Sequence, residues 1–540
     1  MPSRTAARRR SVWVAVGATT AAAVLVAPLA GAATKPKKKV KPKATPAPRP
    51  TLLVDDTAGV GQVGDGLLSL DEAIRLANGT LALSALSTAE RAQITGTPGA
   101  ASADVIRVTL GKTGVITLPL AAPKSPSITK VVGNTGDTID GGGVTLTEQA
   151  PTSIGLDIAS SDFTLLNVTM TNFDEALVVD QGGLDLHNIT IRHVDLETAP
   201  QGSLVVGARS SNGHLRGLNV TDSKITGLGG FDGQPVALTA ANTLAGRVDN
   251  SSLEDVLFAN NDVSGGLEAF YVYGIEANGG AGTNDVVRHV RVVGNYVHDA
   301  IDAGMNLDGA TGIVNTISNS GIEDVTFENN HVVANNWGIG VWAGEAFGGA
   351  SVNGAWVRNV TIRNNRVEGE AGKMTQCIII ESGRVDAAGV ANGNIVDGVN
   401  IVGNDARSCG QSGITVHGGV ALGGGEVAGN IASHITIADN TITGTPLGLV
   451  LRGALATAAS YANGNSTEAV TVTGNRLVSA TDGIRLVGGE TDRAAAVTEN
   501  TLRDVTFSGT QITGSTTLCT ALDDAGPTAL LNSNTAHCPV

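Results

Sequence analysis

Six side chains that could do chemistry recur at nearly equal intervals in the second half of the chain. Each follows a pair of alternating apolar residues, as Trp342 follows Ile339 and Val341. Alternation with a period of two is typical of a strand with one buried face, so each of the six is expected to point outward. They are separated by 32, 34, 39, 36 and 35 residues and are Glu276, Asp308, Trp342, Glu381, His417 and Arg452.

If one interval is one turn of a stacked coil, these side chains form a column that rises by about 4.8 Å per step. Glu276 and Asp308 would then lie about 5 Å apart, close to the carboxylate separation of a retaining glycosidase. Asp308 and Glu381 would lie about 9.6 Å apart, at the upper limit for an inverting one. Elimination from a uronate would instead need a base and a positive charge or Ca²⁺, and His417 and Arg452 could fill these roles.

Aromatic side chains beside these groups could hold a sugar ring. Trp342 stands within the column, and Trp337 precedes it in the same repeat. An indole ring offers a large apolar face with one polar handle, which suits a sugar. Asp302 precedes the column in its own repeat and could join a binding site. The alternative is an ordinary solvated surface, because outward residues on any exposed strand are polar.

The coil that must position this column is visible as an asparagine repeat. An alternating apolar triplet such as Val325-Thr326-Phe327 is followed at a fixed distance by Asn, with steps of 34, 35, 35, 39, 36 and 35 residues. A side-chain amide both donates and accepts, so equivalent Asn residues are expected to hydrogen-bond along a stack. The repeat consists of Asn261, Asn295, Asn330, Asn365, Asn404, Asn440 and Asn475, and a shorter step reaches Asn500.

Each repeat is expected to hold three strands and a loop. The Asn-bend strand is followed by a short strand, then by the strand that carries the column, and then by a long variable loop such as 344–358 or 418–434. Units of this kind cannot bury their apolar face alone and must stack on their neighbours. Weaker copies extend back to about residue 105, so the stack is predicted over 105–515.

These repeats resemble the coils of pectate-lyase-like right-handed parallel β-helix proteins. Residues 51–104 add a strand at Leu52-Leu53-Val54 and an amphipathic helix over 68–77. This helix is similar to the N-terminal cap of secreted β-helix proteins, with Asp71 where that pattern has Arg. The resemblance implies an all-β, right-handed single-stranded parallel β-helix with a capping helix, and a groove along the column strand. That superfamily contains lyases, hydrolases, epimerases and non-enzymatic surface proteins.

The first 50 residues predict export. Arg8–Arg10 precede an apolar stretch over 12–29, and Ala30-Gly31-Ala32 fits a cleavage site, so residues 1–32 are expected to be a signal peptide of the Sec or twin-arginine type. Residues 33–50 are rich in Lys and Pro and predict an extended basic linker, either a spacer or a contact to anionic cell-wall polymer. No later apolar run is long enough to span a bilayer. The expected location is extracellular, secreted or at the cell surface.

The charge of the remaining body limits its partners. Residues 1–50 hold 11 of the 35 Lys and Arg and none of the 50 Asp and Glu, which leaves 24 basic against 50 acidic side chains and a formal charge of −26. Such a body repels phosphates, so nucleic acid is not an expected partner. It could attract Ca²⁺, although no metal or other cofactor is firmly indicated.

The four cysteines predict two structural disulfides. Cys377 and Cys409 fall in neighbouring repeats, while Cys519 and Cys538 would close a loop in the C-terminal tail, residues 516–540. Export makes such bridges possible, and no CxxC metal spacing occurs.

The preferred hypothesis is a monomeric extracellular polysaccharide lyase or glycoside hydrolase with its polymer laid along the column. The alternative is a non-catalytic glycan-binding or structural surface protein that uses the same face. A passive cell-surface spacer is the third possibility.

Overall fold

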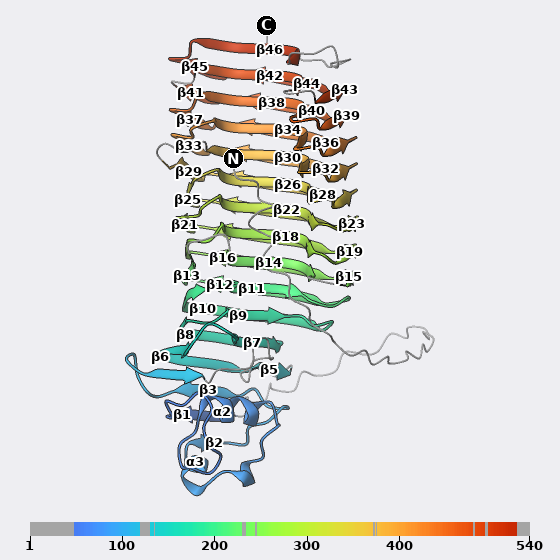
Figure 1. Cartoon of the computed structure of the whole chain (residues 1–540). Coiled ribbons are helices and arrows are strands. Elements are labelled where there is room, and N and C mark those ends of the chain that lie inside the picture. The colour runs from blue at the N-terminus through green and yellow to red at the C-terminus, as the bar shows by residue number, and fades with distance from the viewer. Residues whose placement is uncertain are drawn as a thin grey trace, which may run out of the picture.

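The computed structural model of the chain is a right-handed parallel β-helix whose coils stack along one axis (Figure 1). The expected fold class is confirmed. A coil in the middle of the stack consists of β24 (Gly321–Glu328), β25 (His331–Ala334), β26 (Trp337–Phe347) and β27 (Ser351–Asn353). The structure describes residues 48–118, 130–133, 136–228, 234–243, 246–370, 373, 375–478, 481–491 and 495–525. The predicted signal peptide and nearly all of the predicted linker lie outside these residues.

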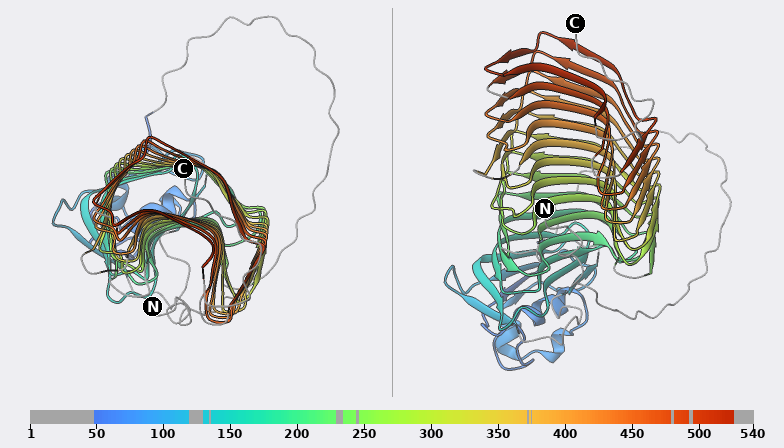
Figure 2. Two further views of the ribbon diagram at one scale, coloured as in Figure 1. Left: turned by 90° about the horizontal axis from the view of Figure 1, so that it is seen from above. Right: turned by 45° about the horizontal axis from the view of Figure 1, so that its top comes forward.

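The strands of the stacked coils gather into three parallel sheets. A 25-stranded sheet contains the first two strands of each coil, a 13-stranded sheet contains the third, and an 8-stranded sheet contains the fourth. The third strand is long and bends, so the backbone outline is concave when seen along the axis (Figure 2, left). We call the outward side of the 13-stranded sheet the concave face.

The fourth strand differs from the expected long loop over 344–358. β26 continues to Phe347, and β27 follows after a tight turn. The reason is a second core, packed from small apolar residues such as Ala346, Val352 and Val385, beside the main core of larger ones. Because these core residues are small, the sequence of the fourth strand resembles that of a loop, and the strand was not predicted.

The predicted asparagine ladder is present at the bend after each Asn-bend strand. Asn330 shows the pattern: its backbone N–H and its Nδ2 both donate to Oδ1 of Asn365, at 2.9 and 3.0 Å, and Nδ2 also donates to the carbonyl of Val292. The same bonds join every step from Asn261 to Asn475. Stacked coils are therefore held in register by side chains as well as by strands.

The expected place of Asn500 in this ladder is wrong. Asn500 accepts from Asn465 and belongs to a second ladder, which lies at the bend after the fourth strand. Both ladders consist of asparagine, so residue type and spacing alone could not show that Asn500 follows Asn465 rather than Asn475. The second ladder comprises Asn394, Asn430, Asn465 and Asn500.

The first end of the stack is closed by β1 (Thr51–Val54) and α2 (Leu70–Ala77). Ser69 caps α2, and Glu72 returns a bond to the Ser69 backbone, forming a capping box. α2 buries Leu70, Ile74 and Leu76 in the main core. β1 pairs in parallel with β3 (Val105–Val108), the first strand after the capping region.

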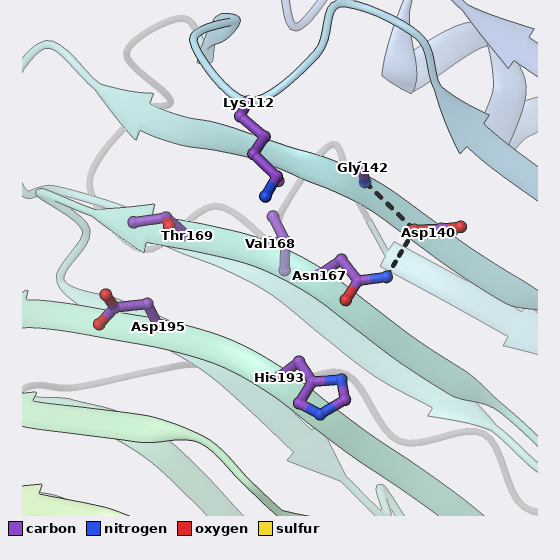
Figure 3. Close-up of a pocket in the computed structure, with 9 residues that line it drawn as sticks. Lys112, Asp140, Gly142, Asn167, Val168, Thr169, His193 and Asp195 are labelled. Carbon is purple, nitrogen blue, oxygen red and sulfur yellow. Dashed lines mark hydrogen bonds between the residues drawn. The ribbon is translucent and has the colours of Figure 1, made fainter.

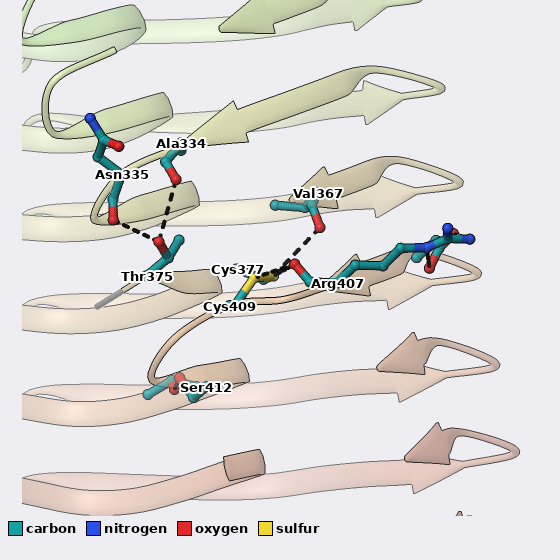
Figure 4. The surroundings of a disulfide bond; sticks show 10 residues. Ala334, Asn335, Val367, Thr375, Cys377, Arg407, Cys409 and Ser412 are labelled. Atoms are coloured by element: carbon teal, nitrogen blue, oxygen red, sulfur yellow. Dashed lines mark hydrogen bonds and ion pairs between the residues drawn. A yellow bond between two sulfur atoms is a disulfide. The ribbon is translucent and has the colours of Figure 1, made fainter. Parts of the chain in front are cut away.

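The cysteines fall in two places. Cys377 and Cys409 form the predicted disulfide, with a Cα–Cα separation of 5.7 Å, between neighbouring coils (Figure 4). Cys519 is disulfide-bonded and lies in β46 (Thr517–Ala525), so the stack continues beyond residue 515. Cys538, its predicted partner, lies outside the described residues.

Candidate functional site

Five of the six predicted residues occupy one column on the concave face. Parallel register pairs Asp308 with Trp342, Trp342 with Glu381, Glu381 with His417 and His417 with Arg452, each in the next coil. Their strands are β22 (Ala303–Ile313), β26, β30 (Gln376–Asp386), β34 (Ser412–Leu422) and β38 (Leu447–Ala456). We call the four residues Trp342, Glu381, His417 and Arg452 the central ladder.

The expected place of Glu276 beside Asp308 is wrong. In β18 (Glu268–Asn278), Tyr273 pairs with Asp308, and Glu276 pairs with Thr311. Phe270 and Val272, rather than Tyr273 and Ile275, align with the core residues of the next coil. The 5 Å carboxylate pair of a retaining glycosidase is therefore not formed by Glu276 and Asp308.

His417 lies between a carboxylate and a guanidinium. Its Nδ1 is 3.1 Å from Oε1 of Glu381, and its Nε2 is 2.8 Å from NH1 of Arg452. Arginine can only donate, so Nε2 accepts and Nδ1 carries the proton that is donated to Glu381. Burial lowers the pKa of His417 more than Glu381 raises it, and the charge of Arg452 lowers it further. The imidazole is thus held neutral in one tautomer, with its basic nitrogen facing Arg452.

Glu381 is the most heavily bonded carboxylate of the central ladder. Oε2 accepts from Nε1 of Trp342 at 2.6 Å and from NH1 of Arg384 at 3.0 Å, while Oε1 accepts from His417. Burial opposes its ionisation, but the charge of Arg384 and the bonds from His417 and Arg384 outweigh burial and lower the pKa to about 2. Glu381 is therefore an anion at any physiological pH.

Two carboxylates continue this ion network on either side. Nε of Arg452 is 2.6 Å from Oε2 of Glu490, which is also bonded to Arg485 at 3.2 Å. Nε of Arg384 is 3.4 Å from Oε1 of Glu345. The two ends of the central ladder are thus joined to carboxylates and guanidinium groups that alternate in contact, a pattern that compensates buried charges.

The tryptophans pack against the sheet and against each other. The Trp342 ring lies over Gly340, where a Cβ would come within 1.8 Å of it, so only glycine fits beneath the indole. Trp337 meets Trp342 edge to face, with ring centroids 5.8 Å apart, and donates through Nε1 to Gln376 at 3.1 Å. Arg384 stacks over Trp337 at 5.2 Å.

The remaining predicted residues lie at the edge of this group. Asp308 accepts from Oγ1 of Thr311 at 3.4 Å. Asp302 is in the turn before β22, where its Oδ1 accepts from Nδ2 of Asn336 at 2.8 Å and its backbone carbonyl accepts from Trp337 N. Asp302 is therefore a turn residue next to Trp337 and is not part of the column.

The side chains of the column are almost fully buried and do not line an open groove. In the whole chain, Asp308 and Trp342 are 0% exposed, Glu381 1%, His417 2% and Arg452 7%. The expectation of a solvated outward row is wrong for these five positions. Trp342, Glu381 and His417 direct their polar atoms to neighbouring side chains rather than to water.

Sequence reasoning missed Glu345, Arg384 and Glu490. They occupy a second outward column, three residues after the first, which also contains Glu276 and Thr311. Their spacing of 39 residues from Glu345 to Arg384 matches the step from Trp342 to Glu381. That match could have indicated a second column at Glu345 and Arg384, but not its contacts with the first column.

This arrangement suits proton transfer next to an anion better than acid-catalysed hydrolysis. A carboxylic proton donor needs a raised pKa, whereas the pKa of Glu381 is lowered. A neutral imidazole with a fixed tautomer is a general base, and a neighbouring guanidinium can neutralise a carboxylate.

The part of the chain that the structure describes contains neither a metal-binding cluster nor a helix that could span a membrane. No group of three or more His, Cys, Asp or Glu side chains in this part of the chain is arranged to hold a metal ion. Ca²⁺ therefore stays a prediction without an assigned site. Among the same residues, no helix is both long and apolar enough to cross a membrane.

No protein-family model and no curated protein matches the chain. Among solved structures, it is similar to the A-module of the Azotobacter vinelandii mannuronan C-5 epimerase AlgE6, with 14% identity and a TM-score of 0.24, over 77% of this chain and 91% of that one. It is also similar to tailspike protein 3 of bacteriophage CBA120, with 11% identity and a TM-score of 0.23, over 76% and 56%. The alginate lyase AlyGC gives 9% identity and a TM-score of 0.16, over 79% and 97%. At these values the similarity assigns neither family nor activity, and function has to be argued from the geometry of the chain.

Proposed function

We propose that this chain is an extracellular polysaccharide-acting β-helix protein that removes the proton next to the carboxylate of a uronate unit. The observation that carries the proposal is the bonding of His417, whose Nδ1 is fixed by Glu381 and whose Nε2 faces Arg452. The disulfide between Cys377 and Cys409 supports an extracellular location.

In the proposed reaction, the uronate carboxylate pairs with Arg452. The guanidinium then turns from His417 toward the substrate, which frees the lone pair on Nε2. Nε2 takes the C5 proton, and Arg452 stabilises the negative charge that develops on the carboxylate. In elimination, the C5–H electrons form the C4–C5 double bond, the C4–O bond breaks, and the leaving oxygen takes a proton from water. In epimerisation, a water molecule protonates the carbanion on its opposite face, and the resulting hydroxide takes the proton from the His417 imidazolium.

Glu381 acts through His417 rather than on the substrate. It holds the tautomer that leaves Nε2 basic, and it stabilises the imidazolium that forms. Glu381 is therefore a positioning residue. Glycoside hydrolysis, the other activity predicted from the sequence, is less well supported, because a carboxylate with a pKa of about 2 cannot supply a proton to a leaving group.

The test is an assay of the full chain on a panel of polyuronates in D₂O. Elimination appears as ultraviolet absorbance of an unsaturated uronate, epimerisation as deuterium at C5, and hydrolysis as new reducing ends without unsaturation. We expect elimination or deuterium incorporation, and we expect His417→Ala to lower its rate by about 10²- to 10⁴-fold.

His434→Ala is the matched control. His434 is also bonded to a carboxylate, Asp397, at 2.7 Å, but its side chain is 73% exposed and lies on the 25-stranded sheet. Its loss should leave the rate unchanged. Absence of both unsaturation and C5 exchange on every polyuronate, with folded protein, would contradict the proposal and favour a non-catalytic binding protein.

A further inference from the structure

A depression of about 500 Å³ lies near the N-terminal end of the stack, outside the concave face (Figure 3). It crosses three neighbouring strands of the 25-stranded sheet, β6 (Thr138–Glu148), β8 (Thr164–Thr171) and β10 (Asp185–Ala199). Its volume is within the range of small-molecule sites in proteins. Its lining combines apolar surface with the polar side chains of Lys112, Asp140, Asn167, Thr169, His193 and Asp195.

A glycine bulge shapes this depression. The pairing of β6 with β8 jumps from Asp140 opposite Leu166 to Val144 opposite Val168, which sets Gly141–Gly143 against the single residue Asn167. Gly142 has φ +61, and a Cβ there would lie 2.8 Å from the carbonyl of Val108. The bulge therefore depends on glycine. It interrupts the regular pairing of β6 beside the polar side chains that line the depression.

Asp140 is already compensated within the wall. Its Oδ1 accepts from Nδ2 of Asn167 at 3.0 Å and from Gly142 N at 3.1 Å, and its Oδ2 is 3.8 Å from Nε of Arg107. Asn167 is thereby oriented by a fixed partner. Such a prearranged carboxylate–amide pair presents its remaining acceptors to a ligand.

Lys112 and Asp195 carry unused bonding capacity. Lys112 extends toward β8 from the loop after β3, and no carboxylate of the described residues is within ion-pair distance of it (Figure 3). Oδ1 of Asp195 is buried and accepts no hydrogen bond in the described part of the chain. Burial and the neighbouring Glu197 raise the pKa of Asp195. One ammonium without an ion-pair partner and one carboxyl group thus line the same depression.

We propose that this depression binds a single acidic sugar unit, with the ligand carboxylate on Lys112 and ligand hydroxyls on Asp140, Asn167 and Asp195. Hydroxyl groups donate to carboxylate and amide oxygens, and an ammonium pairs with an anion. The depression and the central ladder lie on different sheets, so this site is independent of the proposed reaction. It would give the chain a second contact to an anionic glycan.

The test compares D-glucuronate with D-glucose, which differ only in the carboxylate at C6. Binding to the full chain is measured by ligand-detected NMR and by calorimetry at millimolar concentrations. We expect glucuronate to bind at least about 10-fold more tightly than glucose, and Lys112→Met to remove that preference. Lys130→Met is the matched control, since the Lys130 side chain also reaches solvent but lies on the 13-stranded sheet and pairs with Asp157 at 3.0 Å.

Three results would overturn the proposal. They are equal binding of the two sugars, unchanged glucuronate binding by Lys112→Met, and no glucuronate binding at all. His417→Ala separates this site from the concave face: glucuronate binding that persists in Lys112→Met and disappears in His417→Ala would place the sugar on the central ladder instead.

Discussion

At the scale of single residues, Glu381 is the side chain that connects the other polar groups of the concave face. It accepts hydrogen bonds from an indole, a guanidinium and an imidazole, and each of these donors is itself buried. A hydrogen bond to a charged group contributes about 1.5–3 kcal/mol, so loss of the Glu381 charge weakens three such bonds at once. Glu381 therefore supports the fold as well as the proposed base.

Glu381→Gln is predicted to lower the free energy of unfolding by about 3–5 kcal/mol, measured by denaturant titration at neutral pH. The carboxylate has a lowered pKa in the folded state, so its contribution is present above its unfolded pKa of 4.5 and is lost as pH falls toward about 2. The difference between wild type and variant should shrink over that interval. A difference that does not change with pH would contradict the assigned ionisation.

The amino-acid sequence was enough to predict the column from Asp308 to Arg452, because each member follows the same alternating apolar pair. It was not enough for Arg384 or Glu490, which lie beyond the bend in the third strand. Their contacts depend on where that bend occurs, and a period of two cannot encode a bend. The burial of His417 was missed for a related reason, since alternation gives the face of a sheet and not what covers it.

At the scale of elements, the coils that precede the second ladder carry Ser251, Asp285 and Ser320 at the bend after the fourth strand, in place of asparagine. Asp285 occupies the place that Asn394 and Asn430 fill in later coils, with its Oδ1 accepting from Ser251 N at 2.9 Å and its backbone N–H donating to Ser320 at 3.1 Å. Its Oδ2 is buried and has no hydrogen bond within the described residues. Burial, with Asp249 adding repulsion, raises the pKa of Asp285 to about 7.

Asp285→Asn is predicted to stabilise the protein at alkaline pH. Because the folded pKa is raised, the wild-type stability from this group is present below pH 3.8 and is lost as pH rises to about 7. The amide stays neutral and can donate to the carbonyl of Val248, the register equivalent of the Val352 carbonyl that Asn394 uses. We expect a gain of about 1–3 kcal/mol at pH 8 and little gain at pH 4, from thermal unfolding at both values.

Asn365→Asp is the reciprocal variant, since it places a carboxylate in the unbroken first ladder. It should destabilise the protein at pH 8 and much less at pH 4. Equal stability of Asp285→Asn and wild type at both pH values would show that the buried Oδ2 carries no cost.

Register could be predicted where one face of a strand is apolar and the other is not. β26 and β30 satisfy that condition around Trp342 and Glu381. β18 does not, because Tyr271 and Tyr273 make its outward side as apolar as its inward side, and they pack with Val178, Val205 and Ala237 in a separate cluster. A shift of the predicted strand by three residues therefore carried Glu276 into the wrong column.

The stack of coils, at the scale of the whole molecule, could be read from a repeat of about 35 residues, because each coil buries its face only against the next. The concave outline could not be predicted. It depends on a second core of alanine, valine and isoleucine and on a fourth strand of three residues, both of which resemble loop sequence. That outline places the long, bent third strands on one side, and the central ladder spans three steps along them, about 14 Å.

A crystal structure of the full chain soaked with a short oligouronate tests the proposed site most directly. The proposal predicts a sugar carboxylate within ion-pair distance of Arg452 and C5 of the same unit facing Nε2 of His417, with the Arg452–His417 bond broken. An oligouronate bound only elsewhere, with the bonds among Glu381, His417 and Arg452 intact, would contradict it.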